Sequence, residues 1–187
     1  MILGDTKKPS FKVNKNDNYN TPVEAWEFLL NNMQQEAKNN IIWCPFYHDG
    51  TLMNSLKNCN LNLIHVNKDF FTYEPNKFDY IIDNPPYSCK REIMERCLKL
   101  YKPFALLLPL DTLERHYMKD LFNSNTNKIQ VLIPGNRYDF KGSKRRIPFK
   151  SVWIVYDFPL KNNDQLIFQK SSSVSSSVFQ ISSSVSE

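Results

Sequence analysis

Apolar residues in this chain gather into short runs that alternate with amphipathic segments. Seven runs bounded by polar or turn-forming residues are typical of buried strands, and they cover residues 41–43, 61–66, 79–82, 104–108, 129–133, 151–156 and 165–168. Helices are predicted after Thr21, near residues 51–58 and over residues 90–101. Strands that alternate with helices predict an α/β fold with a largely parallel sheet and helices on both faces.

Two of these helices have features that can be checked residue by residue. The first has start signals, because Thr21 suits the cap position, Pro22 the first helical position and Glu24 the third position after the cap. The helix over residues 90–101 is amphipathic, and its inward positions are expected to be Ile93, Met94, Cys97 and Tyr101.

Composition divides the chain into three parts. Residues 1–18 are polar and rich in lysine, so we expect a flexible N-terminal arm, and residues 19–170 are long enough for one domain with its own core. Residues 171–187 consist mainly of serine, which predicts a disordered tail. The alternative for the tail is a self-association stripe formed by Val174, Val178, Ile181 and Val185.

Length and charge narrow the classes of function. No run approaches the roughly 18–20 apolar residues of a membrane span, and the start of the chain lacks the apolar region of a signal peptide. We therefore expect an intracellular, cytoplasmic protein with no membrane partner, in a viral or a host-cell context. The four cysteines show no C-x-x-C spacing, so reduced thiols and no metal site are expected, with a disulfide as the alternative. The net charge of +5 permits a polyanionic partner.

The segment over residues 78–87, FDYIIDNPPY, carries the most specific chemistry. Its strand must end at Pro85 and Pro86, since neither proline can donate to a sheet and each fixes its backbone. Asn84 then offers an amide oxygen, and Tyr87 a flat ring, at the carboxyl edge where open α/β sheets bind ligands. An amide oxygen, a fixed main-chain carbonyl and a ring suit a planar base with an exocyclic amine. The structural alternative is a strand that ends in a diproline turn.

The residues Asn84, Pro85, Pro86 and Tyr87 resemble the catalytic motif of S-adenosylmethionine-dependent amino-methyltransferases, above all those that act on N6 of adenine. With the Pro-Leu pair at 109–110 and the segments 136–140 and 148–151, the chain resembles small phage- and prophage-type adenine methyltransferases over roughly residues 19–168. The resemblance implies a Rossmann-like methyltransferase fold, S-adenosyl-L-methionine as the cofactor and a catalytic role for these four residues.

The same resemblance implies a set of cofactor contacts. Thr21 and Pro22 match the motif whose threonine touches the methionine carboxylate, and a helix N-terminus attracts such a group. The cofactor loop and the adenine contact are matched by Pro45, Asp49, Gly50, Asp69 and Phe70. The loop departs from the family pattern, because Cys44 replaces an acidic residue and Gly50 is its only glycine.

Basic and aromatic residues are interleaved between residues 137 and 150, with six basic residues and one acidic residue. This composition suits phosphate contacts and base stacking. The predicted nucleic-acid contacts are Arg137, Lys141, Lys144, Arg145, Arg146 and Phe149. A solvated hairpin is the alternative interpretation of the same segment.

These observations predict methyl transfer from S-adenosylmethionine to the N6 amine of adenine in nucleic acid, with DNA favoured over RNA. A duplex substrate would need its target base flipped out of the stack. The alternatives are a catalytically silent nucleic-acid-binding homologue, or methylation of RNA or of a protein glutamine amide. The sequence leaves open whether the protein is a monomer or a homodimer.

Overall fold

The fold is known from a computed structural model that describes residues 20–123, 126–140 and 149–169. These residues form a seven-stranded sheet of order β2-β1-β3-β4-β6-β5-β7. The strands are β1 Ile41–Trp43, β2 Asn62–Ile64, β3 Tyr80–Asp83, β4 Phe104–Pro109, β5 Ile129–Ile133, β6 Ser151–Tyr156 and β7 Leu166–Phe168. The predicted N-terminal arm and serine-rich tail lie outside the described residues.

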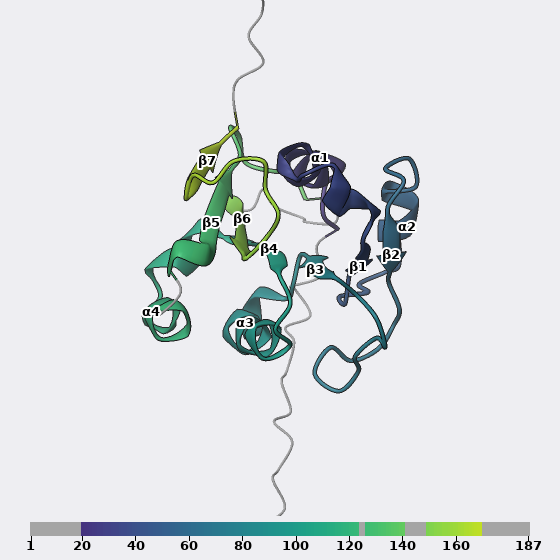
Figure 1. The fold of residues 1–187 in the computed structure, drawn as a ribbon, viewed down its shortest axis with the longest axis horizontal. Coiled ribbons are helices and arrows are strands. Elements are labelled where there is room, and N and C mark those ends of the chain that lie inside the picture. Colours follow the sequence, from purple (N-terminus) through teal and green to yellow (C-terminus); the bar gives the residue numbers. More distant parts are fainter. Residues whose placement is uncertain (1–19, 124–125, 141–148, 170–187) are drawn as a thin grey trace, which may run out of the picture.

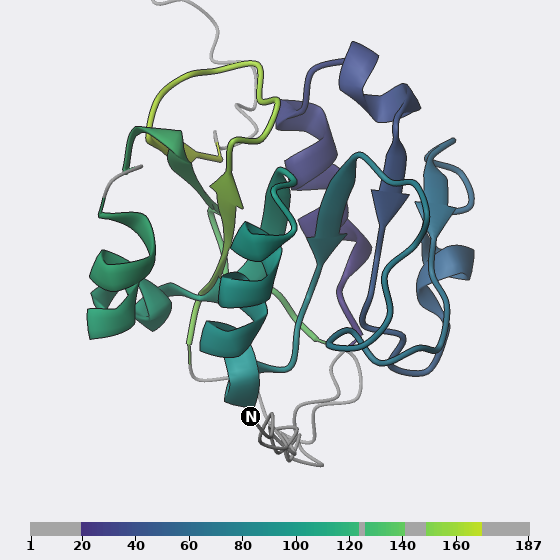
Figure 2. The same cartoon turned by 60° about the horizontal axis from the view of Figure 1, so that its bottom comes forward.

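Only β6 runs against the other strands of this sheet. It pairs antiparallel with β4 and β5, while the remaining neighbours pair in parallel. Figure 2 shows β6 running opposite to β1 and β3. The predicted α/β class with a largely parallel sheet is therefore confirmed, and β6 adds the antiparallel element.

Helices cover both faces of the sheet, as expected. The α-helices are α1 Val23–Asn32, α2 Leu52–Ser55, α3 Lys90–Lys99 and α4 His116–Phe122, and the 3-10 turns are η1 Glu36–Asn39, η2 Tyr87–Cys89, η3 Leu110–Glu114 and η4 Thr126–Lys128. In Figure 1, α1 lies on one side of the sheet, and α3 and α4 lie on the other. No helix in the described residues is long and apolar enough to cross a membrane.

The core has two layers because successive strand residues point to opposite faces. Ile82, Leu107 and Trp153 pack with α1, whereas Ile81 and Leu106 pack with α3 and α4. Every residue of β4 is buried, as expected for a central strand covered on both faces. The long, continuous apolar runs of the sequence thus correspond to the middle of the sheet.

The predicted threonine cap of α1 is wrong. The helix begins at Val23, and Pro22 occupies the cap position with φ −62° and ψ 146° and with no side-chain capping bond. This extended backbone is natural for a proline that precedes a helix, and it moves Thr21 out of the capping position. Val23, at the start of α1, is 36% exposed.

The inward position predicted for Tyr101 is also wrong, since its side chain is 92% exposed. Helix α3 ends at Lys99, and Tyr101 has a positive φ of 52° that turns the chain away from the helical path. The other three predicted positions, Ile93, Met94 and Cys97, are buried. Helix α4 was not predicted at all, because its seven residues are too few for a clear periodic pattern.

Candidate active site

The motif of residues 84–87 follows directly on the carboxyl end of β3. The chain leaves β1 for β2 on one side and returns to β3 on the other side of β1. The carboxyl ends of β1 and β3 therefore flank the point at which the strand order reverses, where open α/β sheets bind ligands. This geometry brings the loop after β1, residues 44–51, next to the motif.

Asp83 connects the motif with this loop. It is the last residue of β3 and only 2% exposed. Its Oδ2 accepts a hydrogen bond from the backbone N–H of Phe46 at 2.6 Å, and its Oδ1 accepts one from the N–H of Asn84 at 2.8 Å. A single carboxyl group thus contacts the backbone that follows β1 and the backbone that follows β3.

His48 makes a second connection between the loop and the motif. Its Nε2 lies 3.0 Å from the backbone oxygen of Asn84, and the tautomer protonated at Nε2 donates to that oxygen. Burial lowers the pKa of His48, which favours the neutral ring. The peptide groups on both sides of the Asn84 Cα are thus held, the N–H by Asp83 and the carbonyl by His48.

Three acidic groups of this region differ in pKa because their surroundings differ. Burial raises the pKa of Asp83 to about 8, although the hydrogen bonds from Phe46 and Asn84 act in the opposite direction. Burial and the nearby Asp83 raise the pKa of the Cys44 thiol, which therefore stays protonated and is a poor nucleophile. Hydrogen bonds from Asn20 and Thr51 lower the pKa of Asp49 to about 2, so that its carboxylate is ionised.

Tyr47 lies over the glycine of the predicted cofactor loop. A Cβ atom added to Gly50 would be 2.6 Å from the Tyr47 hydroxyl oxygen, and Gly50 has a φ of 76°. The Tyr47 ring also stacks on His65, with ring centroids 4.9 Å apart. The positive φ favours glycine at this position, and the atoms that lie closest to it belong to the Tyr47 side chain.

A small cavity separates this loop from the N-terminal side of α1. Its volume is about 20 Å³, and its lining includes Thr21, Asp49 and Asp83. A cavity of this size holds about one water molecule. Asn20 Nδ2 donates to Asp49 Oδ2 at 2.8 Å and so closes one side of it. Two predicted cofactor contacts, Thr21 and Asp49, are thus brought together around a narrow space.

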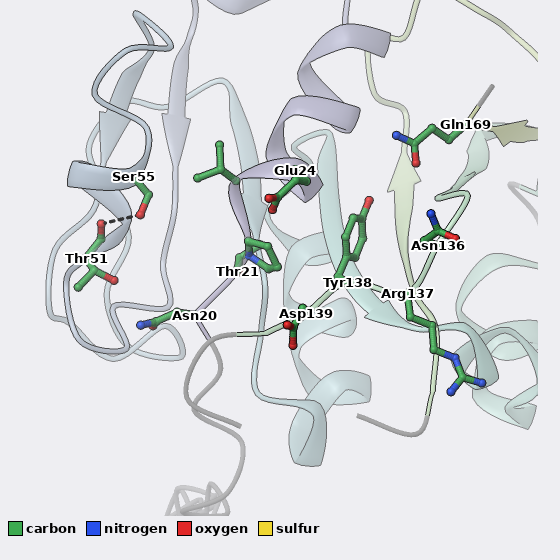
Figure 3. Close-up of a pocket in the computed structure, with 12 residues that line it drawn as sticks. Asn20, Thr21, Glu24, Thr51, Ser55, Asn136, Arg137, Tyr138, Asp139 and Gln169 are labelled. Carbon is green, nitrogen blue, oxygen red and sulfur yellow. Dashed lines mark hydrogen bonds between the residues drawn. The ribbon is translucent and has the colours of Figure 1, made fainter. Parts of the chain in front are cut away.

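A larger cavity of about 700 Å³ adjoins the small one (Figure 3), and the two share Asn20, Thr21, Thr51 and Ser55. Its wall combines the first residues of α1 with Thr51 and Ser55, at the two ends of α2, with the segment after β5 and with Gln169 after β7. The polar groups include the carboxylates of Glu24 and Asp139 and several amides and hydroxyls, and Pro22 also lies here. Its volume falls in the usual range of small-molecule sites, roughly 300–1,000 Å³.

Tyr87 lies next to the start of β6. Its ring centroid is 5.6 Å from that of Phe149 in an edge-to-face arrangement, and its hydroxyl oxygen is 3.5 Å from Ser151 Oγ. Asn84 and Pro85 are buried, whereas Pro86 and Tyr87 are partly exposed. The structure therefore brings Tyr87 and Phe149, predicted as catalytic and nucleic-acid-binding residues, into direct contact.

Asp69 and Phe70 occupy different surroundings from the other predicted cofactor residues. Asp69 is exposed, and its Oδ1 accepts a hydrogen bond from the N–H of Phe71 within its own turn. The Phe70 ring is buried, and it packs on Trp43 and Phe46. Phe70 thus packs against the loop after β1 through its contact with Phe46.

Arg137 is exposed and lies on the wall of the larger cavity, with its guanidinium directed away from Glu24 (Figure 3). Lys150 closes the base of the predicted basic segment, since its Nζ donates to the carbonyl oxygens of Pro134 at 2.8 Å and Gly135 at 3.3 Å. The remaining predicted nucleic-acid contacts lie outside the described residues; they are Lys141, Lys144, Arg145 and Arg146.

Sequence reasoning missed three residues that shape this site: Asp83, His48 and Tyr47. Asp83 lies within the segment 78–87, and an acidic residue at the end of an otherwise apolar strand could have identified it. The packing of Tyr47 over Gly50 had no such signal, since it depends on the path of the loop.

The four cysteines are free thiols. Among the described residues, no cluster of three or more histidine, cysteine or acidic side chains is arranged to hold a metal ion. No family model and no curated protein matches this chain.

Proposed function

We propose that this protein transfers a methyl group from S-adenosylmethionine to the N6 amine of adenine in nucleic acid, with DNA as the favoured substrate. The observation that carries the proposal is the position of residues 84–87 at the strand-order reversal beside the loop after β1. The sheet, with helices on both faces and one antiparallel strand, is compatible with the Rossmann-like methyltransferase fold that the sequence suggests.

The lining of the larger cavity fits the amino-acid end of the cofactor. The N-terminus of α1 favours a carboxylate, and the carboxylates of Glu24 and Asp139 suit an ammonium group. Thr21 and Pro22 would lie beside that end, and Asp49 and Gly50 beside the middle of the molecule. When bound, S-adenosylmethionine supplies an electrophilic methyl group for in-line displacement by the adenine nitrogen.

The residues of the motif would act mainly by positioning. The amide oxygen of Asn84 and the carbonyl of Pro85 accept hydrogen bonds from the exocyclic amine and direct its lone pair, while the Tyr87 ring stacks on the base. Such positioning is a large source of rate when the reacting atoms are held about 3–3.5 Å apart. Because Asn84 is 2% exposed, the base reaches its amide only after the segments that cover it move.

Calorimetric titration with S-adenosylmethionine and with its demethylated product tests the first step. We expect modest affinity, since Tyr47 must leave Gly50. Methyl transfer is then followed with labelled cofactor on single-stranded DNA, duplex DNA and RNA, with N6-methyladenine as the product identified. Asn84→Ala should be inactive while it still binds cofactor, with its melting temperature as the check on folding. If folded protein gave no binding heat at millimolar cofactor, the proposal that it is an enzyme would be wrong.

A second candidate is a catalytically silent nucleic-acid-binding protein. The contact between Tyr47 and Gly50 and the cavity of about 20 Å³ favour it, because both leave little room at the predicted cofactor loop. This candidate predicts nucleic-acid binding that S-adenosylmethionine does not change, and the same titration separates it from the enzyme.

A further inference from the structure

Asp83 was given no role in the cofactor and nucleic-acid contacts described above, yet it accepts hydrogen bonds from both the loop after β1 and the motif. We propose that Asp83 is a positioning residue whose carboxyl group holds the N–H groups of Phe46 and Asn84 together, and thereby orients the Asn84 amide for methyl transfer. This role rests on the proposed function, because the amide has to be oriented only if it receives the target amine.

The geometry supports a positioning role in two ways. The two oxygens of Asp83 are used separately, one for the loop after β1 at 2.6 Å and one for the motif at 2.8 Å. In addition, His48 of the same loop contacts the Asn84 carbonyl at 3.0 Å. Displacement of the loop therefore acts on the Asn84 backbone from both sides, through Asp83 and through His48.

The cost of burying Asp83 indicates that these contacts matter. A carboxyl group that is 2% exposed is unfavourable to bury unless its oxygens are satisfied. Asp83 also lines the small cavity between the loop and Thr21. A cofactor that entered this space and displaced the loop would therefore contact or shift Asp83. An apolar residue at this strand end would leave the N–H of Phe46 without this acceptor.

The chain contains a matched control for this interaction. Asp79, just before β3, accepts a hydrogen bond from the Ile41 N–H through Oδ2 at 2.8 Å. Asp79 and Asp83 therefore make the same type of bond from the two ends of β3, one to the first residue of β1 and one to the loop after β1. Asp79 lies at the amino edge, away from the motif. Asparagine at either position keeps the size of the side chain and replaces one acceptor oxygen with a donor.

Amide hydrogen exchange on the full chain tests the geometry without any need for activity. The single amide oxygen of Asp83→Asn can accept only one of the two bonds. At least one of the amides of Phe46 and Asn84 should therefore exchange about tenfold faster than in the wild type, a loss on the order of 1.4 kcal/mol. The Ile41 amide should be unchanged in this variant and should accelerate in Asp79→Asn. Unchanged exchange at Phe46 and Asn84, or equal acceleration of every sheet amide, would overturn the positioning role.

Steady-state kinetics tests the consequence for the reaction. We expect the kcat of Asp83→Asn to fall by roughly 10- to 100-fold with an unchanged KM for DNA, because a displacement of about 1 Å can cost this much in rate. Asp79→Asn should keep its kcat. If kcat fell equally in both variants, and only as far as the fraction of unfolded protein explains, the role of Asp83 would be merely structural. If the wild type transfers no methyl group, the proposed function fails, and the role in transfer fails with it. The exchange measurement then still reports whether Asp83 fixes Asn84, so the two failures are distinguishable.

Discussion

Tyr47 lies across Gly50 and stacks on His65, so one side chain limits the space beside the loop after β1. If the cofactor binds only when Tyr47 has moved, the measured affinity is reduced by the fraction of molecules in the open state. We therefore expect Tyr47→Ala to bind S-adenosylmethionine about tenfold more tightly than the wild type, as measured by calorimetry. Tyr47→Phe keeps the ring and should resemble the wild type. Weaker binding by the alanine variant would mean that Tyr47 is a cofactor contact and not an obstacle.

The ring of Tyr87 should matter more than its hydroxyl group. The hydroxyl oxygen is 3.5 Å from Ser151 Oγ, the upper limit for a hydrogen bond, whereas the ring faces Phe149 and suits base stacking. We expect Tyr87→Phe to keep most of kcat/KM and Tyr87→Ala to lose about 10- to 100-fold, since stacking on a base contributes roughly 1–3 kcal/mol. Equal losses in the two variants would contradict the stacking role.

The buried carboxyl of Asp83 should make stability depend on pH. Its pKa of about 8 in the folded protein is above the unfolded value of 3.8, so the folded state holds the proton more strongly. The resulting stabilisation is fully present below about pH 4 and is lost as the pH rises through 8. In urea unfolding between pH 5 and pH 9, the wild type should lose stability relative to Asp83→Asn, which has no titratable group there. Parallel curves for the two proteins would show that the Asp83 pKa is not raised.

At the scale of elements, the contact between α1 and β6 holds the first residues of α1 beside the larger cavity. Trp153 of β6 donates from Nε1 to the carbonyl of Ala25 at 2.8 Å, and its ring packs edge-to-face on Trp26. Both tryptophans are fully buried. The Nε1 atom of Trp26, in contrast, has no hydrogen-bond partner among the described residues.

This difference makes a matched pair of substitutions. Trp153→Phe and Trp26→Phe remove the same atoms from the same layer, but only the first breaks a hydrogen bond. We expect Trp153→Phe to destabilise the fold by roughly 1–3 kcal/mol, and by roughly 0.5–1.5 kcal/mol more than Trp26→Phe. Chemical unfolding of both variants measures the difference, and an equal loss would mean that the bond to Ala25 contributes nothing net.

The sequence predicted elements better than their relations. Apolar runs such as residues 104–108 and 151–156 identified strands because continuous burial requires continuous apolar residues. The same runs do not show in which direction a strand runs relative to its neighbours, so the antiparallel orientation of β6 was not predicted. Proline at the end of β3 located the motif, since a residue without N–H cannot extend the ladder. The contact of Asp83 with Phe46 could not be predicted, because it joins a strand end to a loop residue 37 positions earlier in the sequence.

At the scale of the whole molecule, acidic and basic residues lie close together at the carboxyl edge of the sheet, where the candidate site is. Acidic residues line the larger cavity, whereas the predicted basic segment begins at its wall with Arg137. The basic triplet Lys144, Arg145 and Arg146 lies outside the described residues, so its role stays a prediction from the sequence. A protein that binds a polyanion through such groups releases counterions, which makes affinity depend on salt.

Neutralising Lys144, Arg145 and Arg146 to glutamine should weaken DNA binding and flatten its salt dependence. The slope of log K against log salt should become shallower by roughly 0.7–0.9 for each phosphate that the protein no longer neutralises. Glutamine at Lys57, Lys77 and Lys99 is the control, since these exposed residues lie outside the predicted basic segment and the net charge changes equally. An unchanged slope with a lower melting temperature would assign the triplet to the fold.

The hydrogen bonds of Lys150 affect how much the length of the neighbouring segment can vary. Its bonds to the Pro134 and Gly135 carbonyls join the two ends of the segment over residues 136–149, and its own carbonyl accepts from the Leu110 N–H at 2.8 Å. With both ends pinned, doubling the segment length costs only about 0.6 kcal/mol of closure entropy. The sheet should therefore tolerate insertions between Phe140 and Phe149. The two phenylalanines themselves should stay, because Phe140 is buried in the core and Phe149 contacts Tyr87.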